Sequence, residues 1–258
     1  EIAVDMQQGV KSDIWVKQLP GGPFSRLTFS DTLHVRPSWS ADGNTVFFLS
    51  NRGDGTGVVQ ARRADGVGDA TTVLPTTHGY GQVTQSPDGQ WLVLREDNLG
   101  QGDVVAVHMG DTTVVPLVKT SAAEGVPALS PDGKWLAYSS DESGAFEVYV
   151  RPFPNAASAR WQVSTAGGIY PVWSRDGKEI FFRNRANSLV ASTVQTTPTF
   201  RADEQHSLFS LKPFAFTGQV QPYAVSADKR LLMMREVAAG DAGLLIVSEH
   251  WFDELKAR

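Results

Sequence analysis

The chain has 258 residues, of which 41% are hydrophobic and 20% charged, so it is not a disordered polymer and can bury a sizeable core. Its net charge of −5 argues against nucleic acid as the main partner, because phosphate backbones are bound by basic surfaces. The chain has no cysteine, which excludes disulfides, thiolate metal sites and cysteine nucleophiles. No apolar run approaches the roughly 18 residues of a membrane span, so we expect no membrane insertion by this segment.

A tetrapeptide of the form Ser-x-Asp-Gly divides the chain into repeats. It begins at Ser40, Ser86, Ser130 and Ser174, and a variant without the glycine begins at Ser226. The successive serines are 46, 44, 44 and 52 residues apart. A period near 44 residues with short β-type runs is typical of β-propeller blades, whereas solenoid repeats show helices or a shorter period.

The strands can be predicted in chain order. Residues 1–30 contain three short runs, at 2–4, 13–16 and 26–29, which match strands two to four of a blade. In every later repeat one strand precedes the serine, and a buried strand follows the Asp-Gly hairpin at 46–49, 91–94, 135–138, 180–182 or 231–234. An alternating third strand and a shorter fourth one complete the unit. The long interval carries an insertion around 196–206, and residues 251–256 predict a short amphipathic helix.

We therefore predict an all-β fold in which residues 1–258 form a single β-propeller domain. It has six blades of four antiparallel strands and a short C-terminal helix. A partial first blade covers residues 1–34, and the other blades begin at about 35, 81, 125, 169 and 221. The Ser-x-Asp-Gly segments are interpreted as hairpins held by local hydrogen bonds rather than as ligand sites.

One mouth of the central channel is the predicted binding site, because the starts of the innermost strands converge there. The candidate residues are Arg36, Gln82, Tyr170, Tyr223, His34 and His78. The sequence has no Gly-x-Ser-x-Gly elbow and no His-Glu-x-x-His motif. We accordingly expect no catalytic residues, no metal site and no cofactor.

Acidic side chains cluster at two neighbouring hairpins. Glu96, Asp97 and Asp103 flank the first, and Asp141 and Glu142 lie in the second. Oxygen-rich loops can bind calcium, although no Asp-x-Asp-x-Asp-Gly loop with a distal glutamate is present. We interpret both hairpins as solvated turns and keep a calcium site as the alternative.

The pattern Pro-x-Trp-Ser-x-Asp-Gly, followed by an apolar strand and Ser-x-Arg, resembles the WD-repeat-like blades of the TolB family over nearly the whole chain. Segments 148–154, 161–164, 173–177 and 251–256 are similar to the C-terminal propellers of certain bacterial proteins. In those proteins the propeller often follows a eukaryotic-like serine/threonine kinase domain and a membrane span. No kinase motif occurs in this chain. The resemblance implies a periplasmic or cell-surface location and an interaction or sensing role.

Two functions are consistent with these observations. The first is a non-catalytic, extracytoplasmic propeller that binds a protein or peptide. The alternative is a propeller enzyme of the hydrolase or lyase type with its site at the channel mouth. The propeller gate of a prolyl oligopeptidase-type peptidase is a further option, and it requires a hydrolase domain after the propeller.

Overall fold

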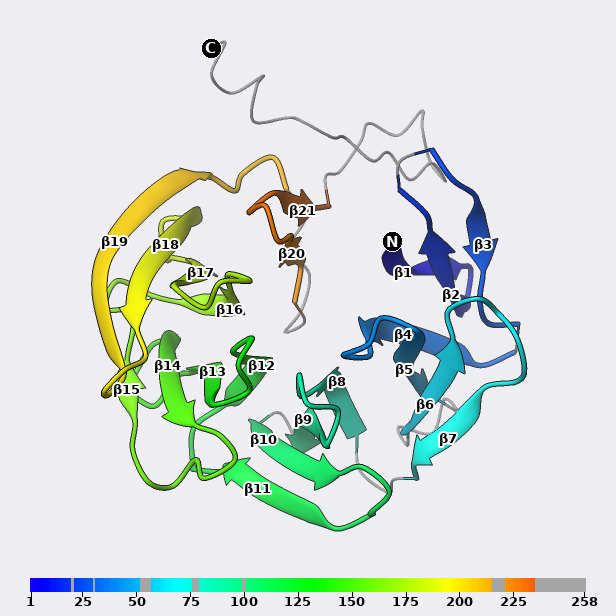
Figure 1. The fold of residues 1–258 in the computed structure, drawn as a ribbon, viewed down its shortest axis with the longest axis horizontal. Coiled ribbons are helices and arrows are strands. Elements are labelled where there is room, and N and C mark those ends of the chain that lie inside the picture. The colour runs from blue at the N-terminus through cyan, green and yellow to red at the C-terminus, as the bar shows by residue number, and fades with distance from the viewer. Residues whose placement is uncertain are drawn as a thin grey trace.

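The computed structural model describes residues 1–19, 21–29, 31–51, 57–75, 79–98, 101–214 and 221–234. These residues form antiparallel β-sheets that follow one another around a central axis (Figure 1). Within these ranges the chain forms strands and turns and no helix. The predicted all-β propeller of four-stranded antiparallel blades is confirmed. The blade count of six and the helix over 251–256 stay predictions, because residues 235–258 lie outside the described part.

Four blades have all four strands, and in each blade consecutive strands pair antiparallel. The first comprises β4 (Leu33–Trp39), β5 (Thr45–Asn51), β6 (Gly57–Arg63) and β7 (Thr71–Leu74). The second comprises β8 (Gly79–Gln85), β9 (Trp91–Asn98), β10 (Gln101–His108) and β11 (Val114–Val118). The third comprises β12 (Glu124–Leu129), β13 (Trp135–Ser140), β14 (Glu147–Pro152) and β15 (Trp161–Gln162). The fourth comprises β16 (Ile169–Trp173), β17 (Glu179–Arg183), β18 (Ser188–Gln195) and β19 (Arg201–Ser210).

A group of three strands and a group of two strands lie on either side of these four blades. At the N-terminus β1 (Ile2–Gln8), β2 (Lys11–Lys17) and β3 (Phe24–Arg26) form an antiparallel group. It joins β4 through a single parallel pair, Ser12 with Leu33. On the other side β20 (Tyr223–Val225) pairs with β21 (Leu231–Met233). The last strand of the first group ends earlier than predicted, because the amides of Leu27 and Thr28 both donate to the Ile14 carbonyl and leave the regular ladder.

The Ser-x-Asp-Gly hairpins share one hydrogen-bond pattern. At Ser130 the hydroxyl donates to Asp132 Oδ1 at 2.5 Å and accepts the Trp135 amide at 3.0 Å. The following glycine, Gly133, has a φ of 68°, a conformation that a glycine adopts without steric cost. In the variant hairpin Lys229 takes the glycine's place and has a φ of 62°. The motif therefore serves the hairpin turn in each repeat.

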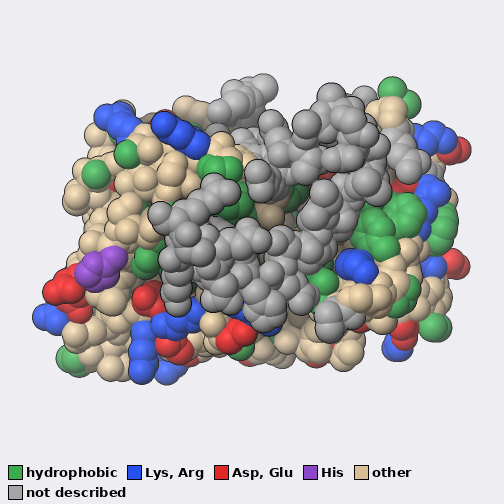
Figure 2. Space-filling model, turned by 90° about the horizontal axis from the view of Figure 1, so that it is seen from above, with side chains coloured by type: hydrophobic (Ala, Val, Ile, Leu, Met, Phe, Trp, Pro, Cys, Tyr) green, Lys and Arg blue, Asp and Glu red, His purple; other side chains and the backbone are tan. Residues whose placement is uncertain are grey.

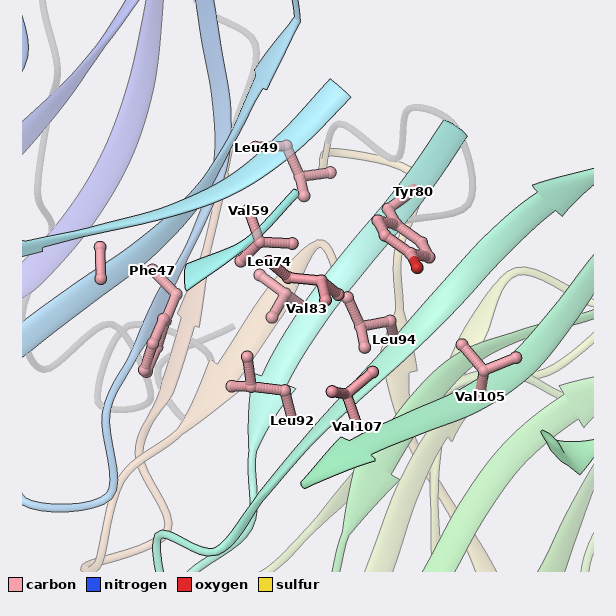
Figure 3. Packing of buried hydrophobic residues seen from close by; sticks show 11 residues of the cluster. Phe47, Leu49, Val59, Leu74, Tyr80, Val83, Leu92, Leu94, Val105 and Val107 are labelled. Carbon is pink, nitrogen blue, oxygen red and sulfur yellow. The ribbon is translucent and has the colours of Figure 1, made fainter. Parts of the chain in front are cut away.

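The hydrophobic core lies between neighbouring blades. Figure 3 shows side chains of β5, such as Phe47 and Leu49, facing Val83 of β8 and Leu92 and Leu94 of β9. All five are buried. Because every blade covers the face of the next, the sequence must place apolar residues on both faces of the middle strands, which is why those runs are continuously hydrophobic.

The predicted insertion around 196–206 contributes to one of these cores. Phe200 is only 2% exposed and lies among three tryptophans of two adjacent blades. Its ring centroid is 5.5 Å from Trp135, 5.6 Å from Trp161 and 6.3 Å from Trp173. The insertion thus places an aromatic wedge between blades and leads into the ten-residue outer strand β19.

Candidate functional site

The predicted channel residues Arg36 and Gln82 lie on inner strands, and their side chains contact the next inner strand. Arg36 Nη1 donates to the Gly81 carbonyl of β8 at 2.7 Å. Gln82 Nε2 donates to the Pro127 carbonyl of β12 at 3.4 Å. Each bond joins residues of neighbouring blades. The two side chains therefore connect blades, and a role for them in ligand binding stays a prediction.

Tyr170 and Tyr223 form a similar connection. The Tyr223 hydroxyl donates to the Tyr170 carbonyl at 2.7 Å, across the gap from β20 to β16. Both residues are 4% exposed, and burial raises the pKa of each phenol. Little of either side chain is offered to a ligand in solution, so these contacts also favour a structural role.

A backbone kink recurs beside these residues. Arg36, Val126 and Tyr170 have φ values of 59°, 52° and 63°, and each one precedes a proline. In all three blades the pairing between the first and second strands shifts register at this residue. A positive φ is unusual for residues with a side chain and bends the inner strand. Sequence reasoning missed this bulge, although a proline at the same position of three repeats was available as a signal.

His34 is buried between the first strand group and the β4–β7 blade. Its ring packs edge-on against Phe48 with centroids 5.1 Å apart, and its Nδ1 lies 3.6 Å from Asp13 Oδ1. Burial lowers the pKa of His34, and the neighbouring Asp13 opposes part of this effect. His78, the other predicted histidine, lies outside the described residues.

An acidic residue lies at or near the start of the third strand of two blades, β10 and β14, and of the corresponding strand β2 in the first group, a feature that sequence reasoning overlooked. In β2, Asp13 accepts the Thr28 hydroxyl at 3.0 Å, and Thr28 also accepts the Ile14 amide at 2.9 Å. In β14, Glu147 accepts the Ser164 hydroxyl, and Ser164 accepts the Val148 amide at 2.8 Å. In both cases a hydroxyl from the residues after the last strand donates a hydrogen bond to the carboxylate and fixes it within the blade. The signal was present as an acid followed 15 or 17 residues later by threonine or serine.

The β8–β11 blade has a lysine at the position of that hydroxyl. Its third-strand acid is Asp103, and Lys119 follows Val118, which pairs with Val104. Lys119 Nζ is 2.9 Å from Asp103 Oδ2 and 3.9 Å from Glu96 Oε2. Glu96 and Asp103 are buried, so the interpretation of this hairpin as a solvated turn was wrong for them. The physical reason is that the packing of one blade against the next covers both carboxylates, and Lys119 contacts them from the solvent side.

A further carboxylate, Glu124, lies at the start of β12, where the next blade begins. It is fully buried, with 0% of its surface exposed. Its Oε1 accepts the Thr120 hydroxyl, and its Oε2 has no hydrogen-bond partner among the described residues. Burial raises the pKa of Glu124, and the nearby Asp103 and Glu142 carboxylates add to the effect.

Glu142 completes this group at the second acidic hairpin. Its Oε2 lies 2.6 Å from Arg160 Nη1, whereas its buried Oε1 has no hydrogen-bond partner in the described part of the chain. An open pocket of about 250 Å³ lies beside it. The pocket is lined by Glu142, Ser143, Tyr149, Arg160 and Gln162.

We call Glu96, Asp103, Lys119, Glu124 and Glu142 the acidic seam, because they follow the boundary between the β8–β11 and β12–β15 blades. The seam is held by ion pairs and hydrogen bonds. Nowhere among the described residues do three His, Asp or Glu side chains lie close enough together to hold a metal ion, so the calcium alternative finds no support in the described geometry. The carboxylate oxygens of the seam can bind a positively charged or hydrogen-bond-donating group.

Elsewhere the described surface carries charges of both signs. Figure 2 shows one side of the ring, where acidic and basic side chains lie next to one another over its lower part. Ion pairs between such exposed side chains are weak, typically under about 1 kcal/mol each, because water and salt screen the charges. No helix that is long and apolar enough to cross a membrane occurs in the described ranges.

Comparison with known proteins gives a fold relationship. No family model matches the chain. The chain is 27% identical to the uncharacterized peptidase YuxL of Bacillus subtilis over 94 residues, which are 36% of this chain and 14% of the peptidase. TolB from Acinetobacter baumannii superimposes with a TM-score of 0.61 at 14% identity, over 77% of this chain and 49% of that one. An oligogalacturonate lyase from Vibrio parahaemolyticus gives 0.60 at 12% identity, over 85% of this chain and 63% of the lyase.

This chain therefore spans a small part of the similar peptidase and about half of the TolB chain. The similar proteins include one named as a lyase and one named as a peptidase beside TolB, so the likeness is one of architecture. It agrees with the ring of antiparallel blades and with the repeat read from the sequence. In its fold, the chain is a TolB-like β-propeller.

Proposed function

We propose that this chain is a non-catalytic β-propeller that binds a protein or peptide, and that it serves as an interaction or sensing domain of a bacterial protein. The observation that carries the proposal is a group of buried acidic side chains beside a pocket. On the inner strands, Arg36, Gln82 and Tyr223 each donate a hydrogen bond to a neighbouring blade, and Gln82 Oε1 is buried without a hydrogen-bond partner among the described residues. At the acidic seam, buried oxygens of Glu124 and Glu142 lack hydrogen-bond partners among the described residues, beside an open polar pocket.

The neighbours of His34 resemble a catalytic triad. Thr32 Oγ1 lies 3.2 Å from His34 Nε2, and Asp13 lies on the other side of the ring. Asp13, however, already accepts the hydroxyl of Thr28 and pairs with Arg26, and its 3.6 Å distance to His34 is too long for a hydrogen bond. Asp13 and His34 are better suited to holding β2 against β4.

An extracytoplasmic location is part of the proposal. It is supported by the resemblance to propellers that follow a kinase domain and a membrane span, and by a cysteine-free composition that is insensitive to an oxidising compartment. Protease protection in spheroplasts, whose outer membrane has been opened, would test it: a cytoplasmic chain stays shielded by the inner membrane, whereas an extracytoplasmic one is digested.

The binding function can be tested without knowing the partner. The purified chain is immobilised and used to select from a random-peptide phage library, with a heat-unfolded sample as the control. We expect peptides that are enriched on the folded chain alone. No enrichment over the unfolded control would count against a peptide-binding propeller. Incubation of the selected peptides and of oligogalacturonate with the chain, followed by mass spectrometry, tests the hydrolase or lyase alternative, which predicts cleaved products.

A further inference from the structure

The acidic seam differs from the equivalent places of other blades by a lysine. After the last strand, Thr28 donates its hydroxyl to Asp13, which also pairs with Arg26, and Ser164 donates its hydroxyl to Glu147. In the β8–β11 blade the same place holds Lys119, and its side chain is 56% exposed, whereas those of Glu96 and Asp103 are 9% and 8% exposed. The compensating cation thus reaches buried carboxylates from the solvent side.

The seam also holds a carboxylate that Lys119 does not contact. Glu124 is fully buried, its Oε2 has no hydrogen-bond partner among the described residues, and its carboxylate interacts electrostatically with both Asp103 and Glu142. A buried polar oxygen without a donor is costly and uncommon in folded proteins. An additional donor, and above all a cationic one, would be stabilised at this point.

The neighbouring pocket can hold the rest of such a ligand. It is open to solvent and polar. The Ser143 hydroxyl and the Gln162 amide nitrogen already donate to backbone carbonyls, which leaves the oxygen atoms of both side chains to accept hydrogen bonds from an extended backbone. The pair between Glu142 and Arg160 covers the Tyr149 ring, with the guanidinium 5.3 Å from the ring centroid. The charge of the seam disfavours phosphate groups, which excludes nucleic acid and anionic lipid headgroups as occupants.

We propose that the acidic seam binds the lysine side chains of a basic peptide segment, and that Lys119 occupies the cation position in the free protein. The ammonium group of the ligand takes the place of the Lys119 ammonium beside Asp103 and Glu96, so these buried carboxylates keep a cation in the exchange. The side chain of the ligand then faces Asp103 and Glu96, and its backbone lies across the pocket. This inference rests on the proposed peptide-binding function.

The test uses the whole chain and a defined probe, acetyl-Gly-Lys-Gly-Lys-Gly-amide, with binding measured by isothermal titration calorimetry at low salt. Lys119→Ser introduces a serine, the residue type that Ser164 provides at the equivalent place of the β12–β15 blade, so the variant should fold. We expect it to tighten binding about five-fold, because the competing cation is gone. Glu142→Gln should weaken binding about five-fold. The matched control Asp203→Asn removes an acid that pairs with Arg201 on β19, in another blade, and should leave binding within about two-fold.

Two results would overturn the inference. Equal weakening by Glu142→Gln and Asp203→Asn would mean that the probe follows the net negative charge alone. Unchanged or weaker binding by a folded Lys119→Ser variant would show that Lys119 does not occupy the ligand's position. In either case the phage selection decides separately on the proposed function, since peptides without lysine, or peptides insensitive to Lys119, can still be enriched.

Discussion

Replacing Tyr223 by phenylalanine tests whether the channel residues are connectors between blades. The substitution removes the hydroxyl that donates to the Tyr170 carbonyl at 2.7 Å, and both residues are 4% exposed. Water cannot readily replace the donor at this burial. Losing one partner of a buried hydrogen bond costs about 1–3 kcal/mol of unfolding free energy. At about 2–4 °C per kcal/mol for a domain of this size, the melting temperature should fall by roughly 2–12 °C.

The measurement is differential scanning calorimetry, with Tyr149→Phe as the matched control. Tyr149 is as buried, but its hydroxyl makes no hydrogen bond to a described residue, so its loss should change stability by less than about 0.5 kcal/mol. Equal effects of the two substitutions would refute the connecting role. If Tyr223 instead served a ligand, its substitution would weaken binding and leave the melting temperature in place.

Three further outcomes are expected. Because burial lowers the pKa of His34, the unfolded chain binds a proton there more readily; stability should decline as the pH falls below about 6.5, and His34→Gln should flatten that part of a melting-temperature profile. Because burial raises the pKa of Glu124, its ionisation costs stability at neutral and higher pH. Glu124→Gln should therefore raise the melting temperature more at pH 8 than at pH 4, and a larger gain in acid would contradict the sign. Phe200→Ala should cost about 3–5 kcal/mol in urea unfolding, since it empties the space among three tryptophans; a loss below 1 kcal/mol would mean that this wedge is dispensable.

Local signals were sufficient to predict the blades. The hairpin at Ser130 depends on contacts within five residues of the chain, and the same four residue types form it wherever they recur. The buried second strands were recognisable because both of their faces are covered, which requires continuous apolar runs. Such features are encoded in short segments and are repeated, so each copy supports the interpretation of the others.

The candidate site was less accessible to such reasoning. The channel mouth was predicted from convergence of the inner strands. The direction of each side chain, however, depends on the bulge at residues such as Arg36 and Tyr170, where a positive φ accompanies a register shift in the ladder. Acidic hairpins were visible, yet their burial was not, because it results from the packing of one blade against the next.

The amino-acid sequence by itself determined the architecture of this protein: a propeller built from repeats whose hairpins and strands are defined within about 44 residues. The tertiary structure alone decided which polar groups join blades and which lie at the seam. Arg36 meets the Gly81 carbonyl, and Glu124 lies near Asp103 and Glu142, only because separate repeats are brought side by side around the ring. Electrostatic interactions depend on distance in space and on burial, and neither quantity can be read along one repeat.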